Sequence, residues 1–289
     1  MHTDGDQQTV PNGQAWGRPV LVEPLIRAAD GTLSLGRYVL HHALEQNGYS
    51  LLYGGYDPEA GREVSIELQA TTTQDQAEAL AAANRLVGLS DPHVLGVREV
   101  GAYADARDAE SVGVFLVMQP VHGLTFDRWL DARPRATRTG SEVDQVVSIF
   151  AQAGRGMAAA HTGGLVHGSF TASSIIVGYD GRARLRGFGQ DPMPSLTPET
   201  EAGMPPSAWS DQYAFCKALQ DALRQVSIKI PRRIARVLAK GMSPNAQDRF
   251  GSMNLLVEAL TKAPLLRFRA ASVGAAGFAL LSIADALRG

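Results

Sequence analysis

The stretch His167-Gly168-Ser169-Phe170-Thr171-Ala172-Ser173-Ser174-Ile175-Ile176-Val177, followed ten residues later by Gly187-Phe188-Gly189, decides how this chain folds. It starts at a histidine, runs through mostly small polar residues and ends in three β-branched apolar residues. A short apolar run of this kind after a polar segment is consistent with a buried strand that follows a loop. The two motifs also contain the residues on which the functional interpretation depends.

Together the motifs resemble the catalytic loop and the magnesium loop of bacterial eukaryotic-like Ser/Thr protein kinases, which read H-R-D-L-K-P-x-N-I-L-V and D-F-G. His167, the apolar strand and Phe188 stand where that family has them. The catalytic groups are replaced by Ser169 at the base Asp, Thr171 at the Lys, Ser174 at the metal-binding Asn and Gly187 at the magnesium-binding Asp. The resemblance therefore implies a degenerate member of the family, a pseudokinase.

The preceding residues resemble the strands of the kinase N-lobe. Short apolar segments between Leu35 and Leu68, separated by turn residues, predict three strands. The family's glycine-rich loop is missing, because Glu45, Asn47 and Ser50 stand at its three glycine positions. No backbone cradle for phosphate groups is therefore expected in this loop.

The segment Val64-Ser65-Ile66-Glu67 stands at the family's V-A-I-K, so that Glu67 replaces the phosphate-binding lysine. At about 4 Å and an effective dielectric near 20, one charge contact is worth on the order of 4 kcal/mol. A reversed charge therefore argues strongly against binding of ATP with magnesium, and we expect no cofactor and no metal. An apolar remnant of the cleft is expected at Leu52, Ser65, Met118 and Ile176.

A helix is predicted over 74–89, with Ala82, Leu86 and Leu89 on one face. By resemblance it is the family's helix αC, whose lysine-pairing glutamate position falls at about Ala82. Two strands are predicted over 94–103 and 113–118, and Met118 begins a segment that resembles the hinge between the lobes.

Three motifs near the end of the domain complete the resemblance. Thr197-Pro198-Glu199 stands at A-P-E after an activation segment of seven residues, 190–196. Asp211, in a helix predicted over 207–225, resembles the aspartate that anchors the catalytic loop. The segment 226–230 stands where helix αG is usually inserted, and Arg249 resembles the arginine that pairs with the A-P-E glutamate. We therefore expect a buried Glu199–Arg249 ion pair.

Several retained residues have structural roles in the family. Leu86, Val97, His167 and Phe188 correspond to its internal apolar stack, and Asp211 lies beneath this stack. The resemblance implies an α+β, protein-kinase-like bilobal fold. It has a small antiparallel N-lobe at 35–119, a mainly helical C-lobe at 120–263 and a reduced activation segment and αG. Residues 1–34 are expected to be a partly disordered lead-in.

Composition agrees with a globular cytoplasmic domain and names no partner. Of the 289 residues, 45% are hydrophobic and 19% charged, which is ordinary for a protein with a large core. A formal net charge of −2 gives no basic face for nucleic acid. The single cysteine, Cys216, cannot form an internal disulfide, which fits a reducing compartment.

The C-terminal segment 264–289 is predicted to be an apolar helix and leaves three readings open. Ala270–Ala284 contains no charged residue, but fifteen helical residues span about 22 Å against about 30 Å of hydrocarbon. The segment could pack on its own C-lobe or on a partner, or it could be a frayed end. Alternatively, residues 267–287 could attach the domain to the inner face of the membrane, since Arg267 and Arg269 precede the apolar run.

The motifs favour a catalytically inactive kinase-like module that acts as a scaffold or allosteric regulator through a protein partner. Fold alone does not establish function, so two alternatives remain. One is an enzyme with reassigned chemistry that transfers a phosphoryl or nucleotidyl group. The other is a membrane-tethered ligand sensor that uses the remnant cleft.

Overall fold

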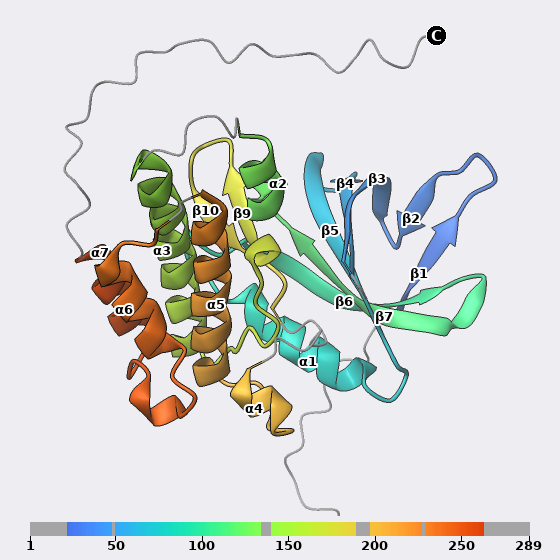
Figure 1. Ribbon diagram of the computed structural model, residues 1–289. Helices are drawn as coiled ribbons and strands as arrows, with labels where there is room; N and C mark the ends of the chain where they lie inside the picture. The colour runs from blue at the N-terminus through green and yellow to red at the C-terminus, as the bar shows by residue number, and fades with distance from the viewer. Residues whose placement is uncertain (1–21, 48–49, 134–139, 189–196, 227–228, 263–289) are drawn as a thin grey trace, which may run out of the picture.

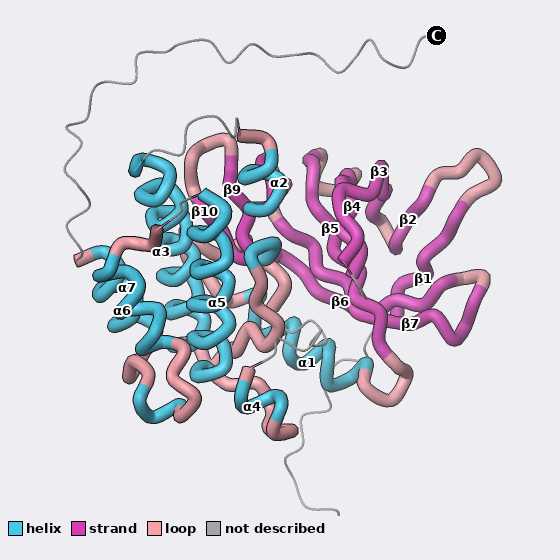
Figure 2. The backbone as a smooth tube through the Cα atoms, viewed as in Figure 1, coloured by secondary structure: helices cyan, strands magenta, loops and turns pink. Residues whose placement is uncertain are grey.

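The computed structural model describes residues 22–47, 50–133, 140–188, 197–226 and 229–262. Strands gather in one lobe and most helices in the other, as Figures 1 and 2 show. The predicted C-terminal helix at 264–289 and the predicted short activation segment at 190–196 lie outside the described residues. Among the described helices, none is long and apolar enough to cross a membrane.

The N-lobe is a closed barrel in the order β1-β2-β3-β4-β5-β7-β6, with one helix beside it. Its strands are β1 Val22–Arg27, β2 Leu33–Leu35, β3 Tyr38–Asn47, β4 Ser50–Asp57, β5 Arg62–Thr71, β6 Val97–Asp105 and β7 Asp108–Met118. Helix α1, Gln76–Val87, contacts β6 and β7. The barrel encloses its own apolar cluster, which includes Leu35, Ile66 and Phe115.

The C-lobe contains a three-stranded sheet and a group of helices. The sheet has the order β10-β9-β8, from β8 Gly123–Thr125, β9 Ile175–Gly178 and β10 Ala183–Leu185. The helices are α2 Phe126–Asp131, α3 Gly140–Thr162, α4 Pro198–Glu201, α5 Ala208–Val226, α6 Arg232–Gly241 and α7 Met253–Thr261, with short 3-10 turns η1 Ala172–Ser174 and η2 Ala246–Asp248. The predicted strand at 175–177 and the helix predicted over 207–225 are therefore present.

Aromatic residues from three helices join in the centre of the C-lobe. The rings of Phe126 and Phe150 are 5.2 Å apart, those of Phe150 and Phe215 are 5.5 Å apart, and both pairs meet edge to face. All three side chains are completely buried. This packing holds α2, α3 and α5 together beneath the loop that follows α3.

The N-lobe begins earlier than the predicted boundary at Leu35. The predicted lead-in at 1–34 includes β1, which pairs with β2 and, in parallel, with β6. The signal for β1 is weak because the strand contains Pro24 and is mostly exposed. Pairing with strands distant in sequence, rather than an apolar face of its own, places β1 in the barrel.

The buried face of α1 also differs from the predicted one. Leu80, Ala83 and Leu86 are buried, whereas Ala82 and Leu89 are half-buried. Leu86 is buried and Leu89 packs half-buried against the common core, as predicted, but Leu80 and Ala83 take the place of Ala82 on the buried face. Apolar periodicity is weak in this run of alanines. The helix still presents one apolar side to the common core.

Candidate functional site

Asp211 fixes the backbone of the loop that begins at His167. Its carboxylate accepts hydrogen bonds from the backbone N–H of His167 at 2.8 Å and of Gly168 at 2.9 Å. The imidazole Nε2 of His161 lies 2.8 Å from the same carboxylate. Gly168 has a φ of +84°, a conformation that glycine adopts without strain. The anchoring role expected for Asp211 is thus present in the structure.

His167 is a packed core residue. Its Nε2 donates to the backbone carbonyl of Arg186 at 3.0 Å, and its ring lies 4.8 Å from that of Phe188. Burial is the main influence on the ring and lowers the pKa of His167 below its ordinary value. The buried ring therefore joins the loop that begins at His167 to the segment before Gly187.

The predicted apolar stack is assembled within one core. Leu86 and Phe188 are buried in the cluster that spans both lobes, and Val97 packs against that cluster while half-buried. Phe188 and His167 are in direct ring contact. These contacts are suited to holding the two lobes in a fixed arrangement.

Glu67, predicted to stand at the position of the family's lysine, lies inside the protein. Its side chain is buried, and the hydroxyl of Ser50 donates to Oε1 at 2.7 Å. Nη1 of Arg186 lies 4.0 Å from the same oxygen, and Arg186 is also buried. The carboxylate therefore contacts a hydroxyl on β4 and a cation that directly precedes Gly187.

Sequence reasoning did not single out Arg186. Arginine is rarely buried unless it is paired, so from the sequence alone its most common interpretation is an exposed residue. The sequence feature that could have identified Arg186 is Glu67, because a buried acid on this strand needs a cation nearby to offset the cost of its burial. The structure brings the two residues together from β5 and from the segment after β10.

The remnant of the adenine slot is covered. Leu52, Met118 and Ile176 are exposed by 2–3% of their surface. Ser65, also buried, accepts a hydrogen bond on its hydroxyl from the backbone N–H of Val121 at 3.0 Å. The backbone N–H of Val121, in the hinge segment, is therefore already hydrogen-bonded to a side chain of the protein.

The substituted residues of the catalytic loop bond to one another. The backbone N–H of Thr171 donates to the hydroxyl of Ser174 at 3.2 Å, and the hydroxyls of Thr171 and Ser173 are 2.8 Å apart. Gly187 has a φ of +82°, which a residue with a side chain rarely adopts. Ser169 is half-buried in the same loop.

The structure does not gather candidate metal ligands at this site. Within the described part of the chain, no three His, Cys, Asp or Glu residues are grouped so that they could hold a metal ion. The four positions that the sequence resemblance assigns to kinase chemistry hold Glu67, two serines and a glycine. Among these side chains only Glu67 has a carboxylate, and its Oε1 accepts a hydrogen bond from Ser50.

The ion pair predicted between Glu199 and Arg249 is confirmed. Oε1 of Glu199 and Nη1 of Arg249 are 2.6 Å apart, and both side chains are buried. The guanidinium also donates to the backbone carbonyls of Trp209 at 2.7 Å and Ser243 at 2.8 Å. The pair connects α4 and the start of α5 to the loop between α6 and α7.

Comparisons with known proteins bear on the fold of the chain and on its relatives. No protein-family model matches the chain. The chain is 26% identical over 272 residues to the serine/threonine-protein kinase PkaB of Streptomyces coelicolor, a match that covers 83% of this chain and 62% of that protein. It is 26% identical over 178 residues to the serine/threonine-protein kinase PknA of Mycobacterium tuberculosis, covering 60% of this chain and 39% of that protein.

A solved structure matches most of the described chain. The PknI kinase domain of Mycobacterium tuberculosis has a TM-score of 0.66 and 19% sequence identity, covering 78% of this chain and 95% of that domain. The chain therefore has a kinase-like, bilobal α+β fold and sequence similarity to bacterial Ser/Thr protein kinases. It spans less than two thirds of the curated relatives named above.

Proposed function

We propose that this chain is a catalytically inactive, kinase-shaped module that works by binding another protein as a scaffold or allosteric regulator. The observation that supports this most directly is the environment of Glu67. A buried acid bonded by Ser50 and facing Arg186 takes the place of a phosphate-binding lysine. The substitution is accommodated by its neighbours instead of leaving an empty binding site.

Nucleotide binding is disfavoured first by charge. A triphosphate placed against Glu67 meets a negative group, and each contact at about 4 Å costs on the order of 4 kcal/mol at an effective dielectric near 20. Rotating Glu67 away breaks its hydrogen bond to Ser50 and separates it from Arg186. Either route therefore opposes the pose that kinases use for phosphoryl transfer.

Nucleotide binding is disfavoured second by the covered hinge. A planar ligand that contacts Leu52 and Ile176 has to displace the protein atoms that bury each of these side chains. It also competes with Ser65 for the N–H of Val121. The contacts that close the remnant cleft are the ones that a base would need.

The elements with which the family contacts its substrates are short in this sequence. Seven residues, 190–196, stand between the Gly-Phe-Gly motif and Thr197. Five residues, 227–231, separate α5 from α6, where the family usually has helix αG. Loss of substrate-facing elements together with retained packing favours a binding role over phosphorylation of a peptide.

One feature favours a second candidate, an enzyme with reassigned chemistry. Arg186 brings a cation to the position before Gly187 and could attract a phosphate group without a metal. This alternative requires that Arg186 exchange its contact with Glu67 for a contact with the nucleotide. The two candidates therefore differ in what ATP does to the folded protein.

Thermal unfolding with ATP, with and without magnesium or manganese, tests the proposal together with transfer of labelled phosphate to the chain and to a generic substrate. We expect neither stabilisation nor transfer. Saturating ATP at 100 times its Kd would stabilise a binding protein by about 2.7 kcal/mol, so binding is readily seen. Metal-dependent stabilisation with transfer would overturn the proposal, and metal-free stabilisation lost in Arg186→Gln would favour the second candidate.

A further inference from the structure

Helix α6 carries a dense group of positive charges on the surface of the C-lobe. Residues 222–247 contain six Lys or Arg and no Asp or Glu, in a chain whose formal net charge is −2. Four of these cations lie on α6 and are exposed, namely Arg232, Arg233, Arg236 and Lys240. We refer to these four residues as the α6 basic face.

The four cations share one side of the helix. At 3.6 residues per turn they fall within about 100° of its circumference. The opposite side is buried in the C-lobe and consists of Ile234, Val237, Leu238 and Gly241. Helix α6 packs against α5 and α7, on the side of the C-lobe farthest from the barrel (Figure 1). The α6 basic face is therefore turned to solvent, while the apolar side of the helix is already used by the core.

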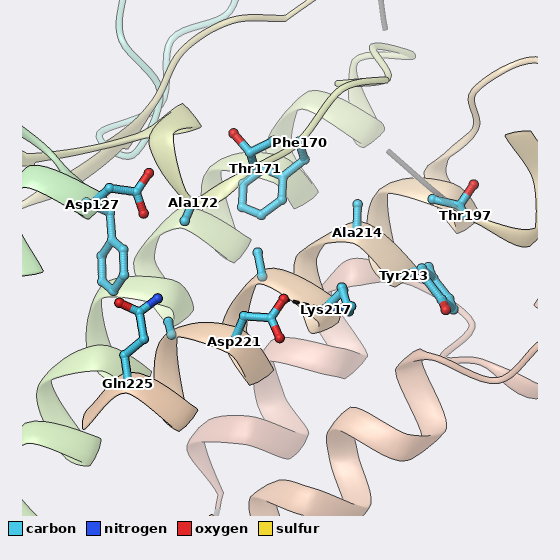
Figure 3. A pocket seen from close by; sticks show the side chains of 13 residues that line it. Asp127, Phe170, Thr171, Ala172, Thr197, Tyr213, Ala214, Lys217, Asp221 and Gln225 are labelled. Carbon is cyan, nitrogen blue, oxygen red and sulfur yellow. Dashed lines mark hydrogen bonds and ion pairs between the residues drawn. The ribbon is translucent and has the colours of Figure 1, made fainter. Parts of the chain in front are cut away.

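The two helices that pack against α6 offset their own surface charges. On α5, the carboxylate of Asp221 lies 2.6 Å from Nζ of Lys217, as Figure 3 shows. At the end of α7, the carboxylate of Glu258 lies 2.8 Å from Nζ of Lys262. Both pairs are formed by residues four positions apart. Asp248, in the loop after α6, is an exposed acid near the end of the helix.

Helix α6 has the opposite pattern of charge. Its residues four positions apart form the pairs Arg232–Arg236 and Arg236–Lys240, so that like charges adjoin. Like charges at this spacing destabilise a helix, whereas opposite charges stabilise it. Within the described ranges of the chain none of the four cations forms an ion pair, although Arg233 donates to a backbone carbonyl and Lys240 lies over the ring of Phe250. A bound anion would offset the repulsion along this face.

The chain leaves the described fold beside the α6 basic face. Arg233 donates a hydrogen bond to the backbone carbonyl of Lys262, the last described residue. Arg267 and Arg269 follow within seven residues, and Ala270–Ala284 then contains no charged residue. Cations next to an uncharged run match the order of chemistry across a bilayer, where lipid phosphates border the hydrocarbon. A nucleic acid or an acidic polypeptide would match the charge alone.

We propose that the α6 basic face binds anionic phospholipid headgroups at a membrane surface, a role beyond the protein binding proposed above. Three of its four cations are arginines, whose planar guanidinium groups donate paired hydrogen bonds to phosphate oxygens. Because the apolar side of α6 is buried in the C-lobe, the helix contacts the headgroup layer without entering the hydrocarbon. Each Lys or Arg close to an anionic membrane strengthens binding roughly fivefold, so the face acts through the sum of its charges.

Sedimentation of the full chain with vesicles tests the proposal. We expect binding to equimolar phosphatidylcholine–phosphatidylglycerol vesicles to be at least about tenfold stronger than binding to pure phosphatidylcholine vesicles, and to weaken as the salt concentration rises. A variant with Arg232→Gln, Arg236→Gln and Lys240→Gln should bind the anionic vesicles on the order of 100-fold more weakly. Its binding to pure phosphatidylcholine should equal that of the wild type, because any contribution of the apolar segment is unchanged.

The matched control removes three exposed cations of the N-lobe through Arg62→Gln, Arg85→Gln and Arg98→Gln. It changes the net charge of the chain by the same amount. We expect it to bind anionic vesicles as the wild type does, because charges more than about 10 Å from the membrane are largely screened. Circular dichroism shows whether each variant keeps its fold, and the comparison of the two vesicle types in the wild type needs no variant.

Several results would overturn the proposal. They are equal binding of the wild type to both vesicle types, an α6 variant that binds like the wild type, and an equal loss in the N-lobe control. Tighter binding to duplex DNA or to polyglutamate, lost in the α6 variant, would assign the face to a nucleic acid or to an acidic protein. Release by sodium phosphate at a far lower ionic strength than by sodium chloride would assign it to free phosphate. None of these results depends on ATP, so the proposed function is tested separately.

Discussion

Oε1 of Glu67 lies 4.0 Å from Nη1 of Arg186, and side-chain exposure is 1% for the acid and 3% for the arginine. The contact joins β5 of the N-lobe to the segment that leads to Gly187 and Phe188. An acid at the position that resembles the family's strand lysine therefore faces a cation one residue before Gly187, which stands at the position that resembles the family's aspartate.

Reversing one charge of this pair should destabilise the protein strongly, and reversing both charges should destabilise it less. Glu67→Lys places two cations in a buried site and leaves Ser50 without its acceptor, so we expect a loss of about 3–5 kcal/mol in the free energy of unfolding. Combining it with Arg186→Glu restores opposite charges and should recover part of that loss. Urea unfolding of both single variants and the double variant gives the coupling energy.

Glu63→Lys is the matched control, since Glu63 is an exposed glutamate on the same strand. It should change the unfolding free energy by less than about 1 kcal/mol. Equal losses for Glu67→Lys and Glu63→Lys, or a double variant whose loss is the sum of the single losses, would contradict a coupled buried pair.

The buried Glu199–Arg249 pair should be a main determinant of C-lobe stability. Arg249→Met removes the cation from a carboxylate 2.6 Å away and also removes donors to the carbonyls of Trp209 and Ser243. We expect a loss of about 3–5 kcal/mol, because the buried acid is left without its cation. Urea unfolding followed by circular dichroism measures it.

The exposed pair Glu258–Lys262 provides a comparison at a similar separation of 2.8 Å. Lys262→Met should cost less than about 1 kcal/mol, since both side chains there are more than half exposed. If Arg249→Met lowers the unfolding free energy by no more than Lys262→Met does, burial does not strengthen the Glu199–Arg249 pair.

Motif positions explain which parts of the site were predictable. The Glu199–Arg249 pair and the anchoring by Asp211 follow from motifs whose residue types are unchanged here. The contact of Arg186 with Glu67 follows from no motif, because it compensates for a substitution and depends on how the two lobes meet. Strand β1 was missed because its pairing partners, and not an apolar pattern of its own, place it in the barrel. Strand β2 has buried Leu33 and Leu35 but is only three residues long, which gives a weak signal.

Removing the carboxylate of Asp211 should loosen the loop at His167. Asp211→Ala leaves two backbone N–H groups and the His161 ring without their acceptor. Each unsatisfied buried donor costs about 1–3 kcal/mol, so we expect a total loss of at least about 3 kcal/mol. Urea unfolding gives the loss, and hydrogen exchange at His167 and Gly168 should accelerate locally.

Asp221→Ala is the corresponding control on the same helix. Its carboxylate is half-exposed and contacts Lys217 and Arg224, so the variant should cost less than about 1 kcal/mol. Unchanged exchange at Gly168 in Asp211→Ala would contradict the anchoring role.

The buried ring of His167 should make folding weaken in mild acid. Its pKa is lowered in the folded protein, mainly by burial, from an ordinary value of 6.5. Below about pH 6.5 the unfolded chain therefore binds a proton that the folded chain excludes, and stability falls as pH decreases towards the folded pKa. The slope from this group approaches about 1.4 kcal/mol per pH unit.

His167→Phe removes this proton while keeping an aromatic ring beside Phe188. The difference in unfolding free energy between the wild type and His167→Phe should therefore be constant above about pH 7.5. Below pH 6.5 the wild type should lose up to about 1.4 kcal/mol per pH unit relative to His167→Phe. His42→Phe alters an exposed histidine and serves as the control for the other titrating groups. Parallel stability curves for the wild type and His167→Phe between pH 5 and 7.5 would mean that the buried ring accepts a proton in the folded state as readily as in the unfolded chain.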